Sequence, residues 1–236
     1  MGDRTVNSLI KSSITTSFRE KDSMHTYATD ANDRKSIPLW LATLAVAATL
    51  FLNYLLKALN LKVPWWIDAP SVMGFYGLLC SLFDNFLWRL QFKAIHLSEI
   101  PNIRGTWVGV MKSFYGGGTE VHGVILYVRQ TWSKLSVQIE TETSRSFSTM
   151  AVVNTSNSSE PGLKYEYINE PGTFSVQTMQ THRGTANLRL TPDGATLKGE
   201  YYTGRGRQNI GDMVFHKIST QFLTRETALK QANYSS

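Results

Sequence analysis

Two long apolar runs precede a region in which apolar and polar residues alternate. The first run, IPLWLATLAVAATLFLNYLL at residues 37–56, contains no charged residue and has roughly the twenty residues that a helix needs to cross a membrane. Pro38 stands at its start, where a missing N–H is harmless. The run neither begins near the N-terminus nor ends in a small-residue cleavage site, as a signal peptide would. We therefore expect a transmembrane helix.

The second run, APSVMGFYGLLCSLFDNFLW at residues 69–88, is apolar except for Asp84. A buried helix of a soluble protein is the alternative to a second membrane crossing. A single crossing, however, would leave the Trp-rich connector KALNLKVPWWID at residues 57–68 as a long unsupported segment on the outer side. The pattern therefore predicts a transmembrane hairpin.

The charges that flank the two runs indicate the orientation of this hairpin. Arg34 and Lys35 precede the first run, and Arg89 and Lys93 follow the second. Basic residues beside membrane helices favour the cytoplasmic side. We expect both termini to lie in the cytoplasm, with Asp84 at the interface, where its charge can reach water or Arg89.

From Gly105 onward the hydrophobic period changes from that of a helix to that of a strand. Short runs rich in Val, Ile, Tyr, Phe and Thr are separated by clusters of Gly, Pro, Asn and Asp, which predicts about eight antiparallel strands. Such a sheet must protect its edges, and an up-and-down β-barrel does so by closing on itself. A β-sandwich is the alternative. FLTRETALKQAN at residues 222–233 could form a short helix after the last strand.

These patterns predict an N-terminal two-helix transmembrane hairpin followed by an all-β domain, a small antiparallel up-and-down barrel. The expected parts are a polar N-terminal segment (1–36), the hairpin (37–90, with helices at about 37–56 and 69–88), a basic linker (91–104), the barrel (105–218) and a C-terminal tail or short helix (219–236).

One predicted strand continues its alternation into an unexpected pair of arginines. Leu197 and Tyr201 share the inward face of this strand, and the same phase continues through Thr203 to Arg205 and Arg207. Tyrosine rings can stack on bases, and guanidinium groups can bind phosphates in a bidentate manner. The predicted ligand-binding residues are Tyr167, Tyr201, Thr203, Arg205 and Arg207. The alternative is that the two arginines belong to a solvated turn.

The net charge of +6 agrees with an acidic partner, although basic residues that flank membrane helices would raise the charge in the same way. Cys80 is the only cysteine, which excludes intramolecular disulfides and a thiolate-rich metal site within one chain. The chain contains none of the GxSxG, HExxH, P-loop or GxGxxG motifs, and His182 is expected at the surface or at a strand edge. We expect no catalytic residue, metal or cofactor.

Small and polar residues recur at helical spacing in the second apolar run. Helices associate in lipid through close backbone approach and polar contacts, because hydrophobic attraction between them is weak there. This predicts an oligomerisation surface, unless the same residues only hold the hairpin together. The residues are Gly74, Gly77, Ser81 and Asn85.

The whole arrangement resembles one family of bacterial proteins. Two N-terminal membrane helices, a basic linker and a small barrel that opens with IPNIRGTW and closes with LKGEYYTGRGRQNIGDMVFHK are similar to the transmembrane β-barrel effectors of CBASS, the cyclic-oligonucleotide-based anti-phage system. The resemblance covers residue 37 to about residue 218.

The resemblance implies a receptor for a cyclic dinucleotide, which a CD-NTase would make on infection. Binding would drive homo-oligomerisation and disruption of the inner membrane, leading to abortive infection. The implied partners are this ligand, the lipid bilayer and further copies of the chain, with no nucleic-acid polymer. The alternatives are a membrane-anchored, lipocalin-like barrel that binds a lipid or another hydrophobic molecule, and a membrane adaptor whose barrel docks another protein.

Overall fold

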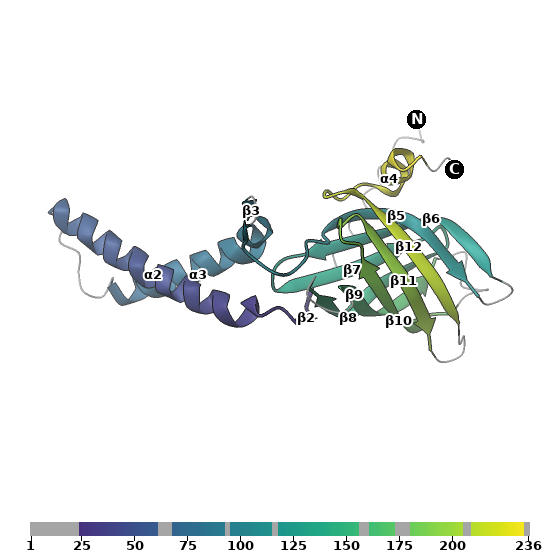
Figure 1. The fold of residues 1–236 in the computed structure, drawn as a ribbon, viewed down its shortest axis with the longest axis horizontal. Coiled ribbons are helices and arrows are strands. Elements are labelled where there is room, and N and C mark those ends of the chain that lie inside the picture. Colours follow the sequence, from purple (N-terminus) through teal and green to yellow (C-terminus); the bar gives the residue numbers. More distant parts are fainter. Residues whose placement is uncertain are drawn as a thin grey trace, which may run out of the picture.

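A helical hairpin joins one end of a closed β-barrel in the computed structural model, which describes residues 24–60, 68–92, 95–114, 118–155, 161–172, 180–204 and 209–233 (Figure 1). The hairpin consists of α2 (Asp33–Ala58) and α3 (Asp68–Asn85). The 3₁₀ helix η2 (Leu87–Arg89) and the short strands β3 (Gln91–Phe92) and β4 (Ile95–His96) lead on to the barrel.

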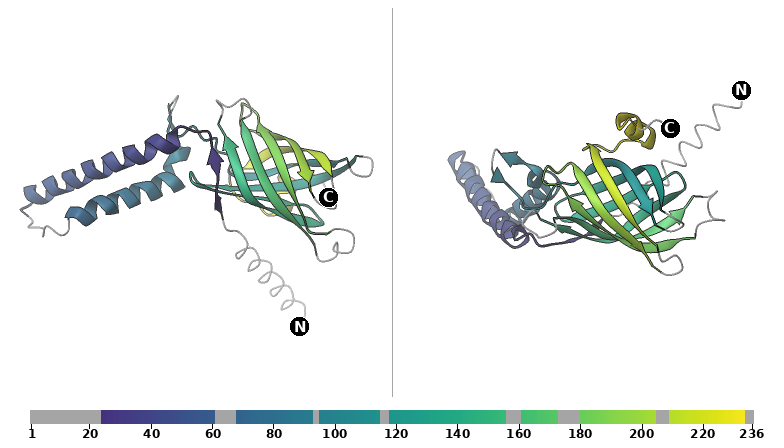
Figure 2. Two further views of the ribbon diagram at one scale, coloured as in Figure 1. Left: turned by 90° about the horizontal axis from the view of Figure 1, so that it is seen from below. Right: turned by 45° about the vertical axis from the view of Figure 1, so that its right-hand side comes forward.

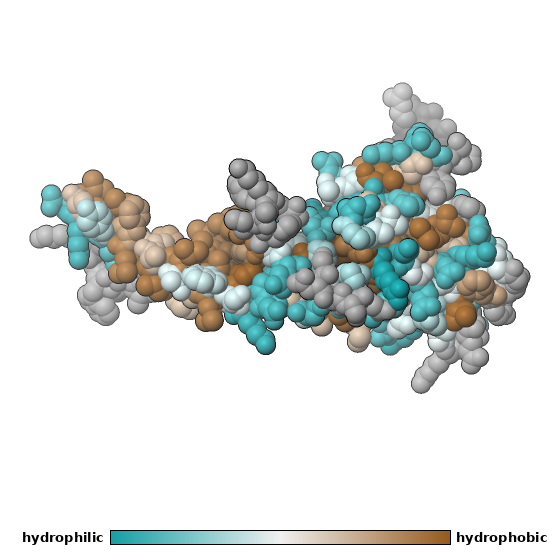
Figure 3. All heavy atoms as spheres, in the orientation of Figure 1, coloured by the Kyte–Doolittle hydropathy of each residue, from teal (hydrophilic) through white to brown (hydrophobic). Residues whose placement is uncertain are grey.

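The two helices lie side by side and antiparallel, and they extend away from the barrel (Figure 2). Among the described helices, α2 is long and apolar enough to cross a membrane by length and composition. Its Ile37, Leu41, Ala45 and Thr49 are buried at regular helical spacing, while most of the hairpin surface is apolar (Figure 3). A second crossing by α3 stays a prediction.

The all-β domain is an antiparallel up-and-down barrel of eight strands, as predicted. Each barrel strand pairs with its neighbours in sequence, and β12 pairs with β5 to close the ring. The strands are β5 (Gly105–Ser113), β6 (Thr119–Gln130), β7 (Lys134–Glu140), β8 (Ser144–Asn154), β9 (Gly162–Pro171), β10 (His182–Leu190), β11 (Thr196–Thr203) and β12 (Ile210–Ser219).

The end of the barrel nearest the hairpin, its base, is filled by apolar side chains. Trp107, Leu197 and Phe215 are completely buried there, and the Trp107 indole N–H donates a 3.0 Å hydrogen bond to the Ile103 carbonyl. One hydrophobic cluster continues from these side chains to the helices, where it includes Leu41. The base is therefore solid, and helices and barrel share a core.

The barrel wall is incomplete between β7 and β8. These strands pair only between Gln138–Glu140 and Arg145–Phe147 and then diverge. The gap is filled by β1 (His25–Thr26), which pairs with β7, and β2 (Ala28–Thr29), which runs parallel to β8. Residues 25–29, here called the seam segment, come from the part of the chain that sequence reasoning treated only as polar.

Side chains hold the seam segment in place. The Tyr27 hydroxyl donates a 2.7 Å hydrogen bond to the Trp132 carbonyl, and burial raises the pKa of this tyrosine to about 12. His25 Nε2 and the Ser148 hydroxyl are hydrogen-bonded at 2.8 Å, and the same hydroxyl accepts from the Val137 N–H at 2.9 Å. Ser148 thus links β8 to β7 where the two backbones have separated.

The hairpin is bonded directly to the turn between β6 and β7. The Asp84 carboxylate accepts a 2.7 Å hydrogen bond from the Ser133 backbone N–H. The backbone carbonyl of Asp84 accepts a 3.0 Å hydrogen bond from the Trp132 backbone N–H. The Arg34 guanidinium lies over the rings of Tyr27 and Trp132, at 4.8 and 4.6 Å from their centroids. The two hydrogen bonds of Asp84 thus join α3 to the barrel. The Arg89 guanidinium, which the sequence suggested as a partner for Asp84, donates instead to the Asn85 carbonyl.

The short helix expected near the C-terminus is α4 (Arg225–Gln231), which packs on the outside of β5 and β6. Ala228 of α4 contacts Val108 and Ile125, whose side chains point outward and are buried under the helix. This explains two apolar residues at outward positions of the barrel.

We expect Tyr27→Phe to weaken the seam without unfolding the chain. Loss of the hydroxyl should lower the free energy of unfolding by about 0.5–1.5 kcal/mol at pH 7. In the unfolded chain Tyr27 loses its proton above about pH 10, whereas in the folded chain it keeps the proton up to its raised pKa of about 12. The free energy of unfolding therefore falls as the pH rises from about 10 to about 12. The variant should lack this part of the alkaline loss.

Urea unfolding of the full chain in detergent micelles, at pH 7 and pH 11, measures both effects. Tyr202→Phe, on the exposed face of β11, is the matched control and should leave stability at pH 7 unchanged. Equal stabilities of wild type and Tyr27→Phe at pH 7 would contradict a stabilising role for the hydroxyl.

Candidate ligand-binding site

A cavity of about 140 Å³, lined by polar, aromatic and apolar side chains, lies inside the barrel at the end opposite the hairpin. We call this end the mouth. The described ends of β5, β7, β9 and β11 and the starts of β6, β8, β10 and β12 lie there. The cavity lining comes from all eight barrel strands or their ends.

The mouth is polar because the inward residues of the strands change character along the barrel. On β9 the inward residues are Leu163, Tyr165, Tyr167 and Asn169 from base to mouth, and all four are buried. The same change occurs on β8 and β11 and just before β12, where the mouth-side buried residues are Ser146, Thr203 and Asn209. Apolar residues therefore fill the base and tyrosines form a middle layer. Around the cavity, hydroxyl and amide groups join the apolar side chains of Met111, Val121, Ile139 and Met213.

The two tyrosines of the cavity wall each lie against a glycine on the neighbouring strand. Tyr167 is the cross-strand partner of Gly184, and Tyr201 is the partner of Gly211. A Cβ atom at either glycine would overlap the tyrosine ring and the adjacent backbone. Glycine thus lets each ring lie flat along the wall with its other face toward the cavity that it lines.

Asn209 organises the rim across three strands. Its side-chain amide donates to the Ser113 hydroxyl at 2.8 Å and to the Tyr201 hydroxyl at 3.3 Å, and its backbone N–H donates to the Thr203 hydroxyl at 2.9 Å. The Asn209 side chain is buried. These bonds fix the positions of two predicted ligand-binding residues, Tyr201 and Thr203.

The described lining of the cavity contains no Asp or Glu side chain. Below it, the Tyr165 hydroxyl is buried without a hydrogen-bond partner among the described residues. Burial, and to a lesser extent the neighbouring Tyr167, raises the pKa of Tyr165, so this hydroxyl stays protonated. The described lining thus offers hydrogen-bonding groups and no carboxylate to repel an anion.

Three of the predicted ligand-binding residues, Tyr167, Tyr201 and Thr203, line this cavity. Arg205 and Arg207 lie outside the described residues. The described chain stops at Gly204, just after β11, and resumes at Asn209, just before β12. The ligand contacts of all five stay predictions.

Sequence reasoning missed other polar residues of the cavity, notably Asn169, His182 and Asn209. His182, expected at the surface or a strand edge, is the first residue of β10, and its half-buried side chain faces the cavity. The change from apolar to polar inward residues was noted only along the strand that ends in Thr203. Applied to β9 and β10, the same reasoning would have found Asn169 and His182.

The predicted oligomerisation residues lie on an exposed face of α3. Gly74, Gly77, Ser81 and Asn85 are all exposed, and a Cβ atom at either glycine would meet nothing within 4 Å. The Asn85 amide donates to the Ser81 carbonyl at 2.9 Å. This stripe therefore does not hold the hairpin together, because α2 packs on another face of α3.

Family models match both parts of this architecture. Residues 98–217 match the model described as Cap15, cyclic dinucleotide receptor domain, and residues 35–89 match the model described as Cap15, TM helices. The chain belongs to the Cap15 family. The barrel is thus the receptor domain of this family, and α2 and α3 form its membrane region, which makes the chain a membrane effector of CBASS.

Two curated Cap15 relatives are similar to this chain, and both are named CD-NTase-associated protein 15. The protein from Yersinia aleksiciae is 30% identical over 148 residues, which cover 63% of this chain and 70% of the relative. The protein from Escherichia albertii is 24% identical over 162 residues, which cover 67% of this chain and 79% of the relative.

Neither matched range of the Cap15 family models includes the seam segment. The membrane model begins at residue 35 and the receptor model at residue 98, whereas residues 25–29 complete the barrel wall. In this chain the receptor fold therefore includes residues that precede its membrane helices.

Proposed function

We propose that the barrel mouth binds a cyclic dinucleotide made by a CD-NTase, and that binding drives homo-oligomerisation and disruption of the inner membrane. The observation that carries this proposal is the cavity inside the mouth, with Tyr167 and Tyr201 on its wall and no acidic side chain in its described lining. Aromatic faces suit bases, and hydroxyl and amide donors suit phosphates and riboses.

The size of the cavity indicates how such a ligand would lie. At about 140 Å³ it is smaller than most ligand pockets, which hold roughly 300–1,000 Å³. A cyclic dinucleotide would place part of a base between the tyrosines and leave its phosphates at the rim. Arg205 and Arg207 lie one and three residues after Gly204 in the sequence, so we assign them the phosphates.

A lipocalin-like function is less compatible with the site. Beside its apolar lining, the cavity presents hydroxyl and amide groups such as those of Thr203 and Asn169, which a wholly hydrophobic ligand would not use. The completely filled base also leaves no deep apolar channel for an acyl chain.

The direct bonds between hairpin and barrel support coupling between ligand and membrane. The seam segment continues into α2 with only three residues between Thr29 and Asp33, and Asp84 of α3 binds the turn between β6 and β7. We propose that both termini lie in the cytoplasm, that α3 crosses the membrane with α2, and that subunits associate through the exposed stripe of α3.

The stacking role of Tyr201 predicts different effects for two neighbouring tyrosines. Tyr201→Leu should weaken cyclic dinucleotide binding by about 1–3 kcal/mol, or roughly 5- to 150-fold, because base–aromatic stacking is lost. Tyr201→Phe keeps the ring and should bind nearly as the wild type does. Calorimetric titration of the full chain in detergent gives the affinities.

Tyr202→Leu is the matched control, because Tyr202 follows on the same strand but points outward. Its affinity should equal that of the wild type. If Tyr201→Leu and Tyr202→Leu bind the cyclic dinucleotide with equal affinity, Tyr201 does not contact the ligand.

The proposed phosphate-binding role predicts a loss of affinity when either Arg205 or Arg207 is replaced. Arg205→Ala or Arg207→Ala should each cost about 1.5–3 kcal/mol, or roughly ten- to a hundredfold in affinity, with folding unchanged. Arg183→Ala is the control, because this side chain is 73% exposed and pairs with Glu166 at 4.0 Å on the outside of the barrel. Unchanged nucleotide affinity in the double arginine variant would contradict the phosphate-binding role and favour the alternative, that both arginines belong to a solvated turn.

The exposed stripe predicts that sensing and membrane disruption can be separated. Gly77→Leu with Ser81→Leu should prevent close helix approach, so that nucleotide still binds while crosslinked oligomers and vesicle leakage disappear. Thr43→Leu with Ala47→Leu is the control, because these residues have the same spacing and are exposed on α2. Ligand-induced oligomers and leakage that persist in the α3 variant would show that the stripe is not the assembly surface.

A further inference from the structure

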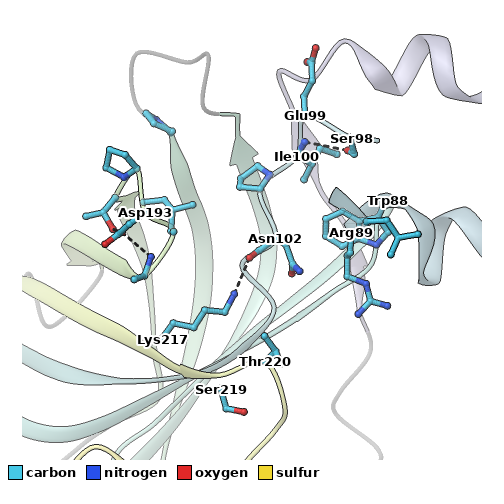
Figure 4. Close-up of a pocket in the computed structure, with 18 of the residues that line it drawn as sticks. Trp88, Arg89, Ser98, Glu99, Ile100, Asn102, Asp193, Lys217, Ser219 and Thr220 are labelled. Atoms are coloured by element: carbon cyan, nitrogen blue, oxygen red, sulfur yellow. Dashed lines mark hydrogen bonds between the residues drawn. The ribbon is translucent and has the colours of Figure 1, made fainter. Parts of the chain in front are cut away.

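Two adjoining clefts lie at the barrel base, where the hairpin meets the barrel. The larger, about 1120 Å³, is bounded by η2, residues 98–102, the turn between β10 and β11, and the end of β12 (Figure 4). The smaller, about 430 Å³, shares Arg89, Asn102 and Thr220 with it and adds Arg104, Gln221 and Phe222. Figure 4 shows Arg89 projecting from the helix tip into the space above the chain that carries Ser219 and Thr220.

The two clefts differ in charge. The larger one includes Glu99 and Asp193 beside Arg89 and Lys217. Asp193 already accepts hydrogen bonds from the Thr191 hydroxyl at 2.5 Å and the Ala195 N–H at 3.0 Å, and the Lys217 ammonium donates to the Asn102 carbonyl at 3.0 Å. The described lining of the larger cleft therefore contains equal numbers of acidic and basic side chains, and Asp193 and Lys217 already have hydrogen-bond partners.

The smaller cleft is cationic. Arg89 and Arg104 both line it, and its described lining contains no acidic residue. The Phe222 ring lies against the Arg104 guanidinium at 5.4 Å and against that of Arg129 at 5.5 Å, which gathers further positive charge at its edge. An anion in this cleft would relieve the repulsion between the two lining arginines.

The position of the cleft in the chain indicates where that anion comes from. Arg89 follows the last residue of α3, Asn85, by only four residues, so it lies at the depth of lipid headgroups if α3 crosses the membrane. Large apolar side chains are exposed around it, namely Phe86, Leu90, Leu97 and Phe222. Cations beside exposed apolar side chains are the composition expected at a membrane interface.

We propose that Arg89 and Arg104 bind the phosphate of an anionic phospholipid at the barrel base. This inference rests on the proposed membrane topology. Guanidinium groups suit the site because each can donate two parallel hydrogen bonds to phosphate oxygens, which an ammonium cannot. Phe222 and Leu90 would contact the apolar part of the same lipid. The bound headgroup would hold the barrel base at the membrane and leave the mouth facing the cytoplasm.

Native mass spectrometry of the full chain in detergent tests this binding with phosphatidylglycerol and phosphatidylcholine as probes. The wild type should retain phosphatidylglycerol at least about tenfold better than phosphatidylcholine. Arg89→Gln with Arg104→Gln should remove this preference, and the double lysine variant, which keeps the charge but loses the bidentate geometry, should retain only part of it.

The matched control is Arg183→Gln with Lys198→Gln, which removes the same charge from exposed positions on the outside of the barrel. It should keep the wild-type preference. A preference that survives in the Arg89/Arg104 glutamine variant, or that falls equally in the control, would overturn the proposal. A cleft that binds inorganic phosphate through these arginines but shows no preference for phosphatidylglycerol would overturn the lipid assignment.

Nucleotide titrations of the same samples separate this proposal from the proposed function. All variants should bind the cyclic dinucleotide as the wild type does, because the cleft and the mouth lie at opposite ends of the barrel. Absence of nucleotide binding in every sample would contradict the proposed function alone. If the wild type and the Arg89/Arg104 glutamine variant retain phosphatidylglycerol equally and both still bind the nucleotide, the lipid site alone is contradicted.

Discussion

The closure of the barrel between β7 and β8 is the constraint on which the rest of the structure depends. These strands pair over only three residues on each side, and the seam segment supplies the backbone partners that the diverging strands lack. Unpaired edges cost hydrogen bonds and invite association with other chains, so a stable barrel needs this segment. Because the segment continues into α2, the receptor wall and the membrane region are built from one continuous stretch of chain.

The barrel interior separates packing from binding along its axis. Apolar side chains around Trp107 fill the base and continue into the helical junction, whereas the mouth keeps a cavity with tyrosine, hydroxyl and amide groups. A ligand at the mouth therefore cannot reach the membrane through the interior. Under the proposed function, the effect of the ligand on the helices would have to travel through the wall, and the wall segment that continues directly into α2 is the seam segment. The cationic cleft at the base would meanwhile hold that end of the barrel against the lipid.

Hydrophobic periodicity was sufficient to predict the hairpin, the eight-stranded barrel and the inward positions of Tyr167, Tyr201 and Thr203, because each depends on local alternation. It could not reveal the seam segment, since two-residue strands carry no periodic signal and their pairing depends on where β7 and β8 diverge. Asn209 was missed for a different reason. Its role comes from hydrogen bonds across three strands, and these depend on a register that a single strand does not specify. Asp84 similarly gained its partner, the Ser133 N–H, only from tertiary packing.

Hydrogen–deuterium exchange of the full chain in detergent, with and without a cyclic dinucleotide, tests the central claim most directly. If the mouth is the receptor site, ligand should slow exchange in residues 141–146, 167–169 and 201–213, around the cavity, and change it in the seam segment that leads to α2. Ligand-induced protection confined to the barrel base or to its outer surface, with exchange at the mouth unchanged, would contradict the account.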